Sequence, residues 1–196
     1  MEEIKELVKL LYEMGQLKRV KRSGWWAVGV KDHETVAEHS FRAIVIGKIL
    51  AHLEKADEDK VASMILYHDI PEARINDLHK VGALYLDKHV PEEKVLREQI
   101  KRLPESLHKE AESLFEEYTK RVTKEALVAK DADILELCLS VKEHQEQNYQ
   151  GLESWFVNAE KQIKTETGKK IFRTIRITKS TSWWEDIQEI QDLLAH

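Results

Sequence analysis

Histidine and aspartate side chains at a few positions of this sequence have the types and the surroundings of a metal centre. His39 and His68 lie among apolar residues, and Asp69 follows His68 directly. Asp131 and Asp133 interrupt the most apolar stretch of the chain. Buried imidazoles and carboxylates need partners, and a divalent cation can satisfy several of them at once. Each feature alone is common in packed cores, but their joint presence predicts a bound ion, without choosing between Asp131 and Asp133.

The end of a helix is needed to bring His68 and Asp69 to the same ion. Neighbouring residues of a regular helix point about 100° apart, because there are 3.6 residues per turn. Pro71 disfavours helical geometry at Ile70, so we expect the helix to end or bend near Asp69. Both side chains can converge there.

The elements that must position these side chains are predicted to be helices. Gly 7 and Pro 3 are few for this length, which argues against a β-sandwich or a loop-rich scaffold. Thr35 with Glu38 is a capping-box pattern, and Asp57 is a candidate cap for the next helix. Apolar residues recur at helical spacing along most of the chain. We expect helices over 4–14, 35–50, 57–69, 92–102, 105–120, 125–145, 152–165 and 168–177 and from residue 182 onward.

The stretch 125–145 is apolar around most of its circumference, which is typical of the buried central helix of an all-α domain. Residues 16–34 lose the helical period and predict a basic, aromatic loop. With 196 residues and no repeat or linker, the sequence predicts a single all-α domain over 1–196. The motifs would lie within 18–133, and 150–196 would add C-terminal helices to the same domain.

Charge and composition narrow the function classes. Lys+Arg 31 against Asp+Glu 36 gives a net charge of -5, which argues against a nucleic-acid polymer as partner. Cys138 is the single cysteine, which excludes an intramolecular disulfide and suits a reducing compartment. The charged N-terminus is unlike a signal peptide, and no apolar run is long enough to span a membrane. We expect a cytoplasmic protein with no membrane partner.

The order of His39, His68-Asp69 and Asp133 along the chain resembles that in the HD-domain metal-dependent phosphohydrolases. The resemblance covers residues 1 to about 150 and is closest to the 5′-deoxynucleotidase subgroup. The similar segments are K-R-S-G-W (21–25), T-V-A-E-H-S (35–40), Y-H-D-I-P-E-A (67–73), N-D-L (76–78) and K-D-A-D (130–133).

The resemblance implies that one divalent ion is held by four ligands, and it selects Asp133 over Asp131. The implied ligands are His39, His68, Asp69 and Asp133. Two imidazoles and two carboxylates suit Mn²⁺, Co²⁺ or Fe²⁺, with Mg²⁺ or Zn²⁺ as further possibilities. Such an ion polarises a phosphoryl oxygen and lowers the pKa of a bound water.

Two further acids gain catalytic roles from the resemblance. Glu72 would orient or deprotonate the attacking water, and Asp77 would position it or assist the leaving alkoxide. Acids of this kind are otherwise common on solvated surfaces.

The loop that precedes His39 would bind the nucleotide. Cations there can neutralise phosphate oxygens, and an indole can pack on a sugar. Relatives place a Trp at the position of Trp25 against the deoxyribose, and some place an Arg directly before it. Gly24 occupies that preceding position here, so Arg19, Lys21 and Arg22 all stay candidates for the phosphate.

The resemblance implies hydrolysis of deoxyribonucleoside 5′-monophosphates, with a small nucleotide as the only ligand besides the metal. Another HD phosphohydrolase activity is the alternative, on a triphosphate, a cyclic dinucleotide or guanosine tetraphosphate. The I-P-E-A continuation at 70–73 argues against it. A non-catalytic, metal-stabilised nucleotide-binding module is the third possibility. Because relatives are commonly dimers, a homodimer is expected.

Overall fold

The computed structural model describes the chain except for residues 88, 186, 188–189 and 191–196. Within the described residues every regular element is a helix, and the only strand-like pairing is an isolated bridge between Lys21 and Thr35. The helices are α1 (Glu2–Met14), η1 (Gly15–Lys18), η2 (Ser23–Val28), α2 (Val36–Glu54), α3 (Glu58–His68), α4 (Glu72–Ile75), η3 (Gly82–Leu84), α5 (His89–Ile100), α6 (Glu105–Lys120), α7 (Lys124–Glu146), α8 (Glu153–Gln162), α9 (Glu166–Ile177) and α10 (Ser182–Glu185). The predicted all-α fold is confirmed.

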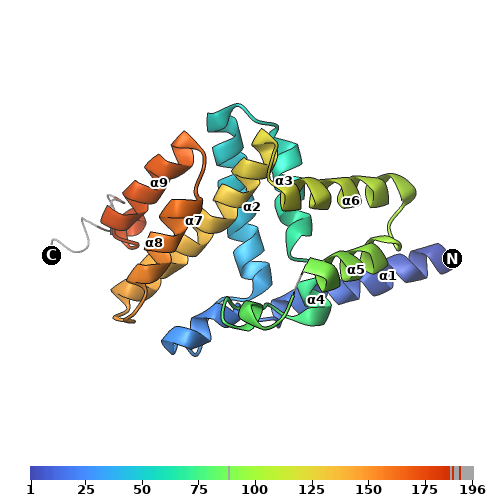
Figure 1. Ribbon diagram of the computed structural model, residues 1–196, viewed down its shortest axis with the longest axis horizontal. Coiled ribbons are helices and arrows are strands. Elements are labelled where there is room, and N and C mark those ends of the chain that lie inside the picture. Colours follow the sequence, from blue (N-terminus) through green and yellow to red (C-terminus); the bar gives the residue numbers. More distant parts are fainter. Residues whose placement is uncertain (88, 186, 188–189, 191–196) are drawn as a thin grey trace.

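The long helix α7 is the buried centre that its all-round apolar sequence predicts. It packs against α2, α3 and α6 and also against α8 and α9 (Figure 1). The α2 helix packs closely on α3 because Gly47 faces it: a Cβ placed at Gly47 would lie 2.3 Å from Ile65 Cδ1. These close contacts bring α2, α3 and α7 together, and each of them carries predicted metal ligands.

The helix starts follow the capping signals in the sequence. Thr35 Oγ1 accepts a hydrogen bond from the Glu38 backbone N–H at 3.2 Å, and the Glu38 carboxylate accepts from the Thr35 N–H at 2.6 Å. Asp57 caps α3 by accepting from the N–H groups of Asp59 and Lys60. Such caps fix where a helix begins. The register of His39, one turn into α2, is therefore set locally.

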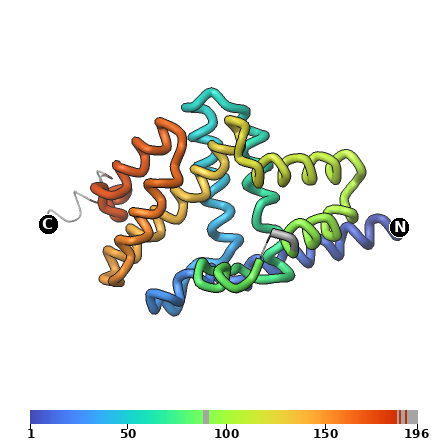
Figure 2. Tube along the Cα trace, in the orientation of Figure 1, coloured from blue at the N-terminus to red at the C-terminus, as the bar shows by residue number. Residues whose placement is uncertain are grey.

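Two apolar clusters hold the molecule together. The larger one joins α2, α3, α7, α8 and α9 and includes Trp25. The smaller one joins η1, the start of α2, α5 and α6 through residues such as Leu17, Leu96 and Phe115. Figure 2 shows α1 and α9 at opposite ends of the trace, with α2, α3 and α7 between them. The predicted ligands His39, His68 and Asp133 lie on these middle helices.

Some apolar residues that predict α1 and α2 by their spacing are not buried. Ile4 and Leu11 of α1 are more than half exposed, and Leu10 is the buried residue of that helix. Phe41 and Ile49 of α2 are also exposed. Helical spacing identifies an apolar face, but it does not say whether the chain itself covers that face. Across the described residues, no helix is long and apolar enough to cross a membrane.

Candidate metal and nucleotide site

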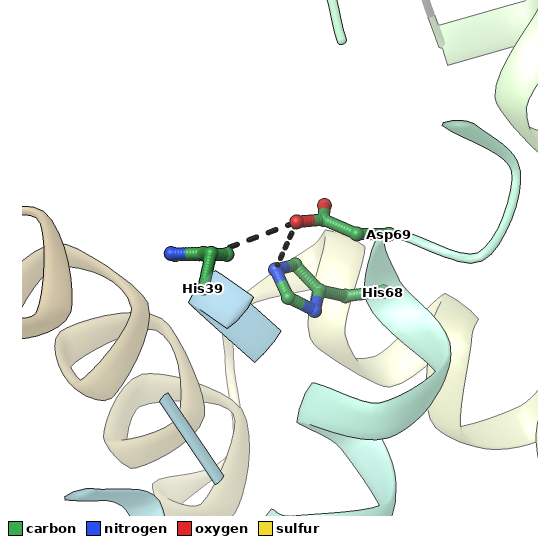
Figure 3. Close-up of side chains that lie close together, drawn as sticks. All are labelled: His39, His68 and Asp69. Carbon is green, nitrogen blue, oxygen red and sulfur yellow. Dashed lines mark ion pairs between the residues drawn. The ribbon is translucent and has the colours of Figure 1, made fainter. Parts of the chain in front are cut away.

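The predicted metal ligands meet where α2, α3 and α7 come together. His39 lies in the first turns of α2, His68 is the last residue of α3, and Asp133 lies within α7. Asp69 has left helical geometry, with φ -108° and ψ 3°, as expected from the nearby Pro71. His68 and Asp69 can therefore face the same point, and Figure 3 shows one oxygen of the Asp69 carboxylate paired with both imidazoles.

Four ligand atoms form a closed ring. His39 Nε2 lies 3.1 Å from Asp133 Oδ1 and 3.7 Å from Asp69 Oδ2. His68 Nε2 lies 3.0 Å from Asp69 Oδ2 and 3.9 Å from Asp133 Oδ1. Neighbouring ligands of a six-coordinate ion with bonds near 2.1 Å are about 3 Å apart. The atoms of His39, His68 and Asp69 lie within 4.8 Å of one another, close enough to share one ion, and Asp133 Oδ1 lies beside both imidazoles.

Both imidazoles are held so that Nε2 points to the centre of this ring. The Nδ1 atom of His68 donates to the Ile65 carbonyl at 2.6 Å. The Nδ1 atom of His39 makes a short hydrogen bond to Glu136, which is fully buried. A histidine that donates from Nδ1 presents an unprotonated Nε2, the usual arrangement of a metal-bound imidazole.

Buried atoms without partners test whether a cation fits here. In the described part of the chain, His39 Nε2, His68 Nε2 and Asp69 Oδ2 are buried and make no hydrogen bond of acceptable geometry. Buried polar atoms are rarely left this way, because each one costs the free energy of its lost hydration. A divalent cation bound by the two nitrogens and the carboxylate oxygens satisfies all of them, so the residues fit a metal ion.

Electrostatics lead to the same conclusion. Burial opposes charge on Asp69, but His68 and Arg22 more than offset it and hold the pKa of Asp69 below its usual range. Burial and Arg22 lower the pKa of His39, yet the nearby carboxylates of Asp133 and Glu136 raise it to about 9. The clustered carboxylates thus favour positive charge at their centre, whether a proton or a cation supplies it.

The structure separates the two candidate aspartates of α7. Asp133 directs Oδ1 to the ring, while its Oδ2 pairs with Lys130 and lies 3.3 Å from the Tyr118 hydroxyl. Asp131 instead accepts hydrogen bonds from the backbone N–H groups of Lys164 and Thr165, at 2.9 and 2.7 Å. Asp131 is therefore occupied in holding the start of α9.

A cavity of about 460 Å³ opens beside the ligands. His68, Asp69 and Asp133 form part of its wall, and Arg22 and Glu72 lie in the same lining. This volume falls within the range of roughly 300–1,000 Å³ that is usual for small-molecule sites. The cavity is large enough for a nucleotide in contact with the metal ligands.

The structure places both predicted catalytic acids at this cavity. Glu72 is the first residue of α4 and is buried, with an exposed fraction of 3%. Asp77 also lines the cavity, but its Oδ2 accepts hydrogen bonds from the Ser23 N–H at 2.6 Å and the Ser23 hydroxyl at 3.0 Å. Glu72 and Asp77 therefore share the cavity lining with three of the predicted metal ligands, and Asp77 is hydrogen-bonded to Ser23.

The three candidate phosphate-binding cations lie in different places. A guanidinium nitrogen of Arg22 lies 3.6 Å from Asp69 Oδ2, and Arg22 lines the cavity. Burial would lower the pKa of Arg22, but the surrounding carboxylates raise it, so it stays charged. Arg19 is exposed and bonds Gln16, and Lys21 bonds the His33 carbonyl. Neither Arg19 nor Lys21 is among the described residues that line the cavity.

Trp25 forms part of the cavity wall as a buried residue, with an exposed fraction of 1%. Its ring stacks on Trp155 at 4.7 Å and meets His144 edge-on at 4.6 Å. Its Nε1 donates to Glu34 Oε1 at 3.3 Å. The indole is therefore a fixed surface of the cavity, and Trp155, for which the sequence analysis predicts no role at the site, lines the cavity beside it.

Sequence reasoning missed the residues that support the ligands. They include Glu136, which lies three residues after Asp133 in the same apolar helix, and Arg42, which lies three residues after His39. Arg42 Nε donates to Glu136 Oε1 at 2.9 Å, so the charge of Glu136 is balanced where it is buried. A charged residue inside an apolar helix is the signal that could have found Glu136, as it found Asp131 and Asp133.

Comparisons with known proteins agree on one family. A family model described as HD domain matches residues 14–176. The chain is 31% identical over 143 residues to the 5′-deoxynucleotidase HDDC2 of Homo sapiens, covering 72% of this chain and 70% of that protein. A conserved hypothetical protein from Pyrococcus furiosus superposes with a TM-score of 0.74 at 30% identity, over 87% of this chain and 99% of its own.

A second solved structure supports the fold alone. It is described as a predicted metal-dependent phosphohydrolase from Magnetospirillum magnetotacticum, with a TM-score of 0.69 at 22% identity. The match covers 88% of this chain and 90% of that one.

Proposed function

This chain belongs to the HD domain family, and we propose that it is a metal-dependent phosphomonoesterase that hydrolyses deoxyribonucleoside 5′-monophosphates to deoxynucleoside and phosphate. The observation that carries the proposal is the ring of His39, His68, Asp69 and Asp133, of which the last three line a nucleotide-sized cavity. Similar proteins from vertebrates, an amoeba and yeasts are named 5′-deoxynucleotidases, which supports this substrate class.

The four ring residues would hold one divalent cation, and their donor set favours Mn²⁺, Co²⁺ or Fe²⁺. When bound, such an ion supplies Lewis-acid polarisation of the phosphoryl oxygens and acidifies water. Glu136 and the Ile65 carbonyl would keep the two imidazoles in the ligand orientation. Mg²⁺ or Zn²⁺ is compatible with the same atoms and ranks lower on donor type.

The side chains of the cavity would share the remaining work. Arg22 neutralises phosphate oxygens, because it stays charged next to the metal ligands. Glu72 accepts a proton from the attacking water as that water bonds to phosphorus. The bond from phosphorus to the 5′ oxygen then breaks, and the proton held by Glu72 passes to this oxygen, directly or through water, which gives the deoxynucleoside and restores the Glu72 carboxylate.

Sugar selection would rest on Trp25. The indole is a buried and fixed surface of the cavity, so a 2′-hydroxyl pressed against it loses water and gains no partner. That loss is worth on the order of 1–3 kcal/mol, or roughly 5- to 150-fold in kcat/KM. Asp77 would hold Ser23, and with it the loop that carries Arg22 and Trp25.

A phosphate-release screen tests the proposal. Nucleoside mono-, di- and triphosphates are offered to the purified protein with Mn²⁺, Co²⁺, Mg²⁺ or Zn²⁺ in turn. We expect phosphate from deoxyribonucleoside 5′-monophosphates and little from the other substrates. Hydrolysis confined to triphosphates or to cyclic dinucleotides would assign another HD phosphohydrolase activity, and tight nucleotide binding without turnover would make the protein a binding module.

We also propose that two copies of the chain associate through the outer face of α2. Phe41, Val45, Ile49 and Leu53 lie four residues apart along this helix, and their exposed fractions range from 45% to 72%. An apolar stripe of this kind is typical of an interaction surface. Light scattering should give the mass of a dimer for the wild type and of a monomer for Phe41→Glu. A monomeric wild type at micromolar concentration contradicts the proposal.

The arrangement of the helices supports residues 1–196 as one domain, because α7 packs against helices on both of its sides. A reducing compartment such as the cytoplasm is our proposed location. The free thiol of Cys138 and a nucleotide substrate both support it.

A further inference from the structure

A cluster of polar side chains joins α2, α7 and the segment before α2, outside the cavity lining. It consists of Glu34, Glu136, Arg42 and Ser140. Glu34, Glu136 and Ser140 are largely or fully buried, although they are not among the described residues that line the cavity. Polar groups in such places are retained when they fix the geometry of other residues.

Glu34 contacts the nucleotide loop in two ways. Its carboxylate Oε1 accepts the hydrogen bond from Trp25 Nε1 at 3.3 Å. Its backbone carbonyl accepts from the Arg22 N–H at 3.1 Å. Glu34 therefore helps to fix the position of the Trp25 side chain, which would contact the sugar, and of the Arg22 backbone, whose side chain would bind the phosphate.

The same carboxylate is connected to the metal ligands. Glu34 Oε2 lies 3.2 Å from Ser140 Oγ, which lies 3.3 Å from Glu136 Oε1. Arg42 donates to Ser140 Oγ at 2.5 Å and to Glu136 at 2.9 Å. Glu136 in turn holds His39. A continuous set of hydrogen bonds thus runs from the Trp25 indole to the imidazole that faces the metal site.

We propose that Glu34 is a positioning residue for sugar selection, which acts by fixing the Trp25 indole relative to the metal centre. The inference rests on the proposed function. A wall that could move aside would accept a 2′-hydroxyl, whereas an indole held by stacking on Trp155 and by a hydrogen bond to Glu34 excludes it. Glu34 does not touch the nucleotide itself, so its effect should depend on Trp25 Nε1.

A double-mutant cycle on the ratio of kcat/KM for dAMP to that for AMP tests this dependence. Glu34→Leu should lower the ratio about 3- to 10-fold, the effect of one lost hydrogen bond. Glu34→Gln should keep the ratio, because its amide oxygen still accepts from Nε1. Trp25→Phe, which keeps a ring and loses the donor, should lower the ratio as much as Glu34→Leu. The double variant should show no further loss.

Asp32→Asn is the matched control, since Asp32 is a fully exposed carboxylate in the same segment, and it should leave the ratio unchanged. An unchanged ratio in folded Glu34→Leu or in Trp25→Phe overturns the inference, and so do additive losses in the double variant. If the wild type prefers dAMP but the variants give one of these overturning results, only the role of Glu34 is refuted and the proposed function stands. Wild-type protein that releases no phosphate from either nucleotide refutes the function, and this inference with it.

Discussion

The two carboxylate oxygens of Asp133 have different partners. Asp133 has Oδ2 in contact with Lys130 and Tyr118, and this pairing turns Oδ1 toward His39. Burial alone would favour the neutral acid, but Lys130 and the histidines hold the pKa of Asp133 well below its ordinary value. A charged oxygen aimed at two imidazole nitrogens is what a metal ligand requires.

Asp131 and Asp133 should therefore respond differently to truncation. Asp133→Ala should lose most of the bound metal, because one of the four ring atoms is removed. Asp131→Ala should keep the metal and lose about 1–3 kcal/mol of the free energy of unfolding, because the N–H groups of Lys164 and Thr165 lose their acceptor. Elemental analysis and urea unfolding measure the two effects. Metal loss in Asp131→Ala alone would reverse the assignment.

Glu72→Gln should abolish turnover and leave the metal bound. Its proposed role concerns the attacking water, and general acid–base groups contribute about 10²- to 10⁴-fold to kcat. Steady-state kinetics with metal analysis on the same sample separate the outcomes. Near-normal kcat with full metal would make Asp77 the catalytic acid, whereas a loss of metal would place Glu72 among the ligands.

Among the elements, the loop that carries Arg22 and Trp25 is fixed by contacts from outside itself. Ser23 bonds Asp77 through its N–H and its hydroxyl, and an isolated bridge joins Lys21 to Thr35. The loop is thereby attached to the segment after α4 and to the start of α2. Both attachments lie next to residues of the proposed site, so the loop cannot shift without changing the cavity.

Ser23→Ala should raise KM for dAMP with little change in kcat, because it loosens the loop without touching the metal ligands. The loss of the hydroxyl contacts to Asp77 corresponds to about 2- to 10-fold. Ser182→Ala in α10 is the control and should have no effect. A fall in kcat at constant KM would instead mean that Ser23 supports the chemical step.

Local signals in the sequence predict the elements well and their partners poorly. The Thr35–Glu38 capping box and the Asp57 cap set the starts of α2 and α3, and Pro71 marks the end of α3. Each of these depends on residues close in the chain. The hydrogen bond from His39 to Glu136 depends on how α2 lies against α7, which no local pattern encodes.

In the candidate site, too, local motifs predict some residues, whereas others depend on how the chain folds. Four ligands could be named from sequence because the family motifs fix their order, yet their roles stay proposals until metal binding is measured. Spacing could not choose among Arg19, Lys21 and Arg22, because a loop of unknown path carries all three. The structure brings only Arg22 to the cavity, since Arg19 and Lys21 have partners elsewhere.

For the whole molecule, the all-α fold and the membership of the HD domain family, both predicted from the sequence, are confirmed. The fold brings three helices together so that predicted ligands far apart in the chain lie close to one another, with the cavity beside them. Metal dependence and sugar preference should therefore appear in one assay, because both depend on the same cavity.

The most direct test is phosphate release from dAMP and AMP by protein stripped with EDTA and then resupplied with Mn²⁺ or Co²⁺. We expect no release after stripping, recovery with added metal, and a kcat/KM for dAMP that is higher than that for AMP by roughly 5- to 150-fold. Release that persists without metal, or equal rates on both nucleotides after recovery, would contradict this expectation.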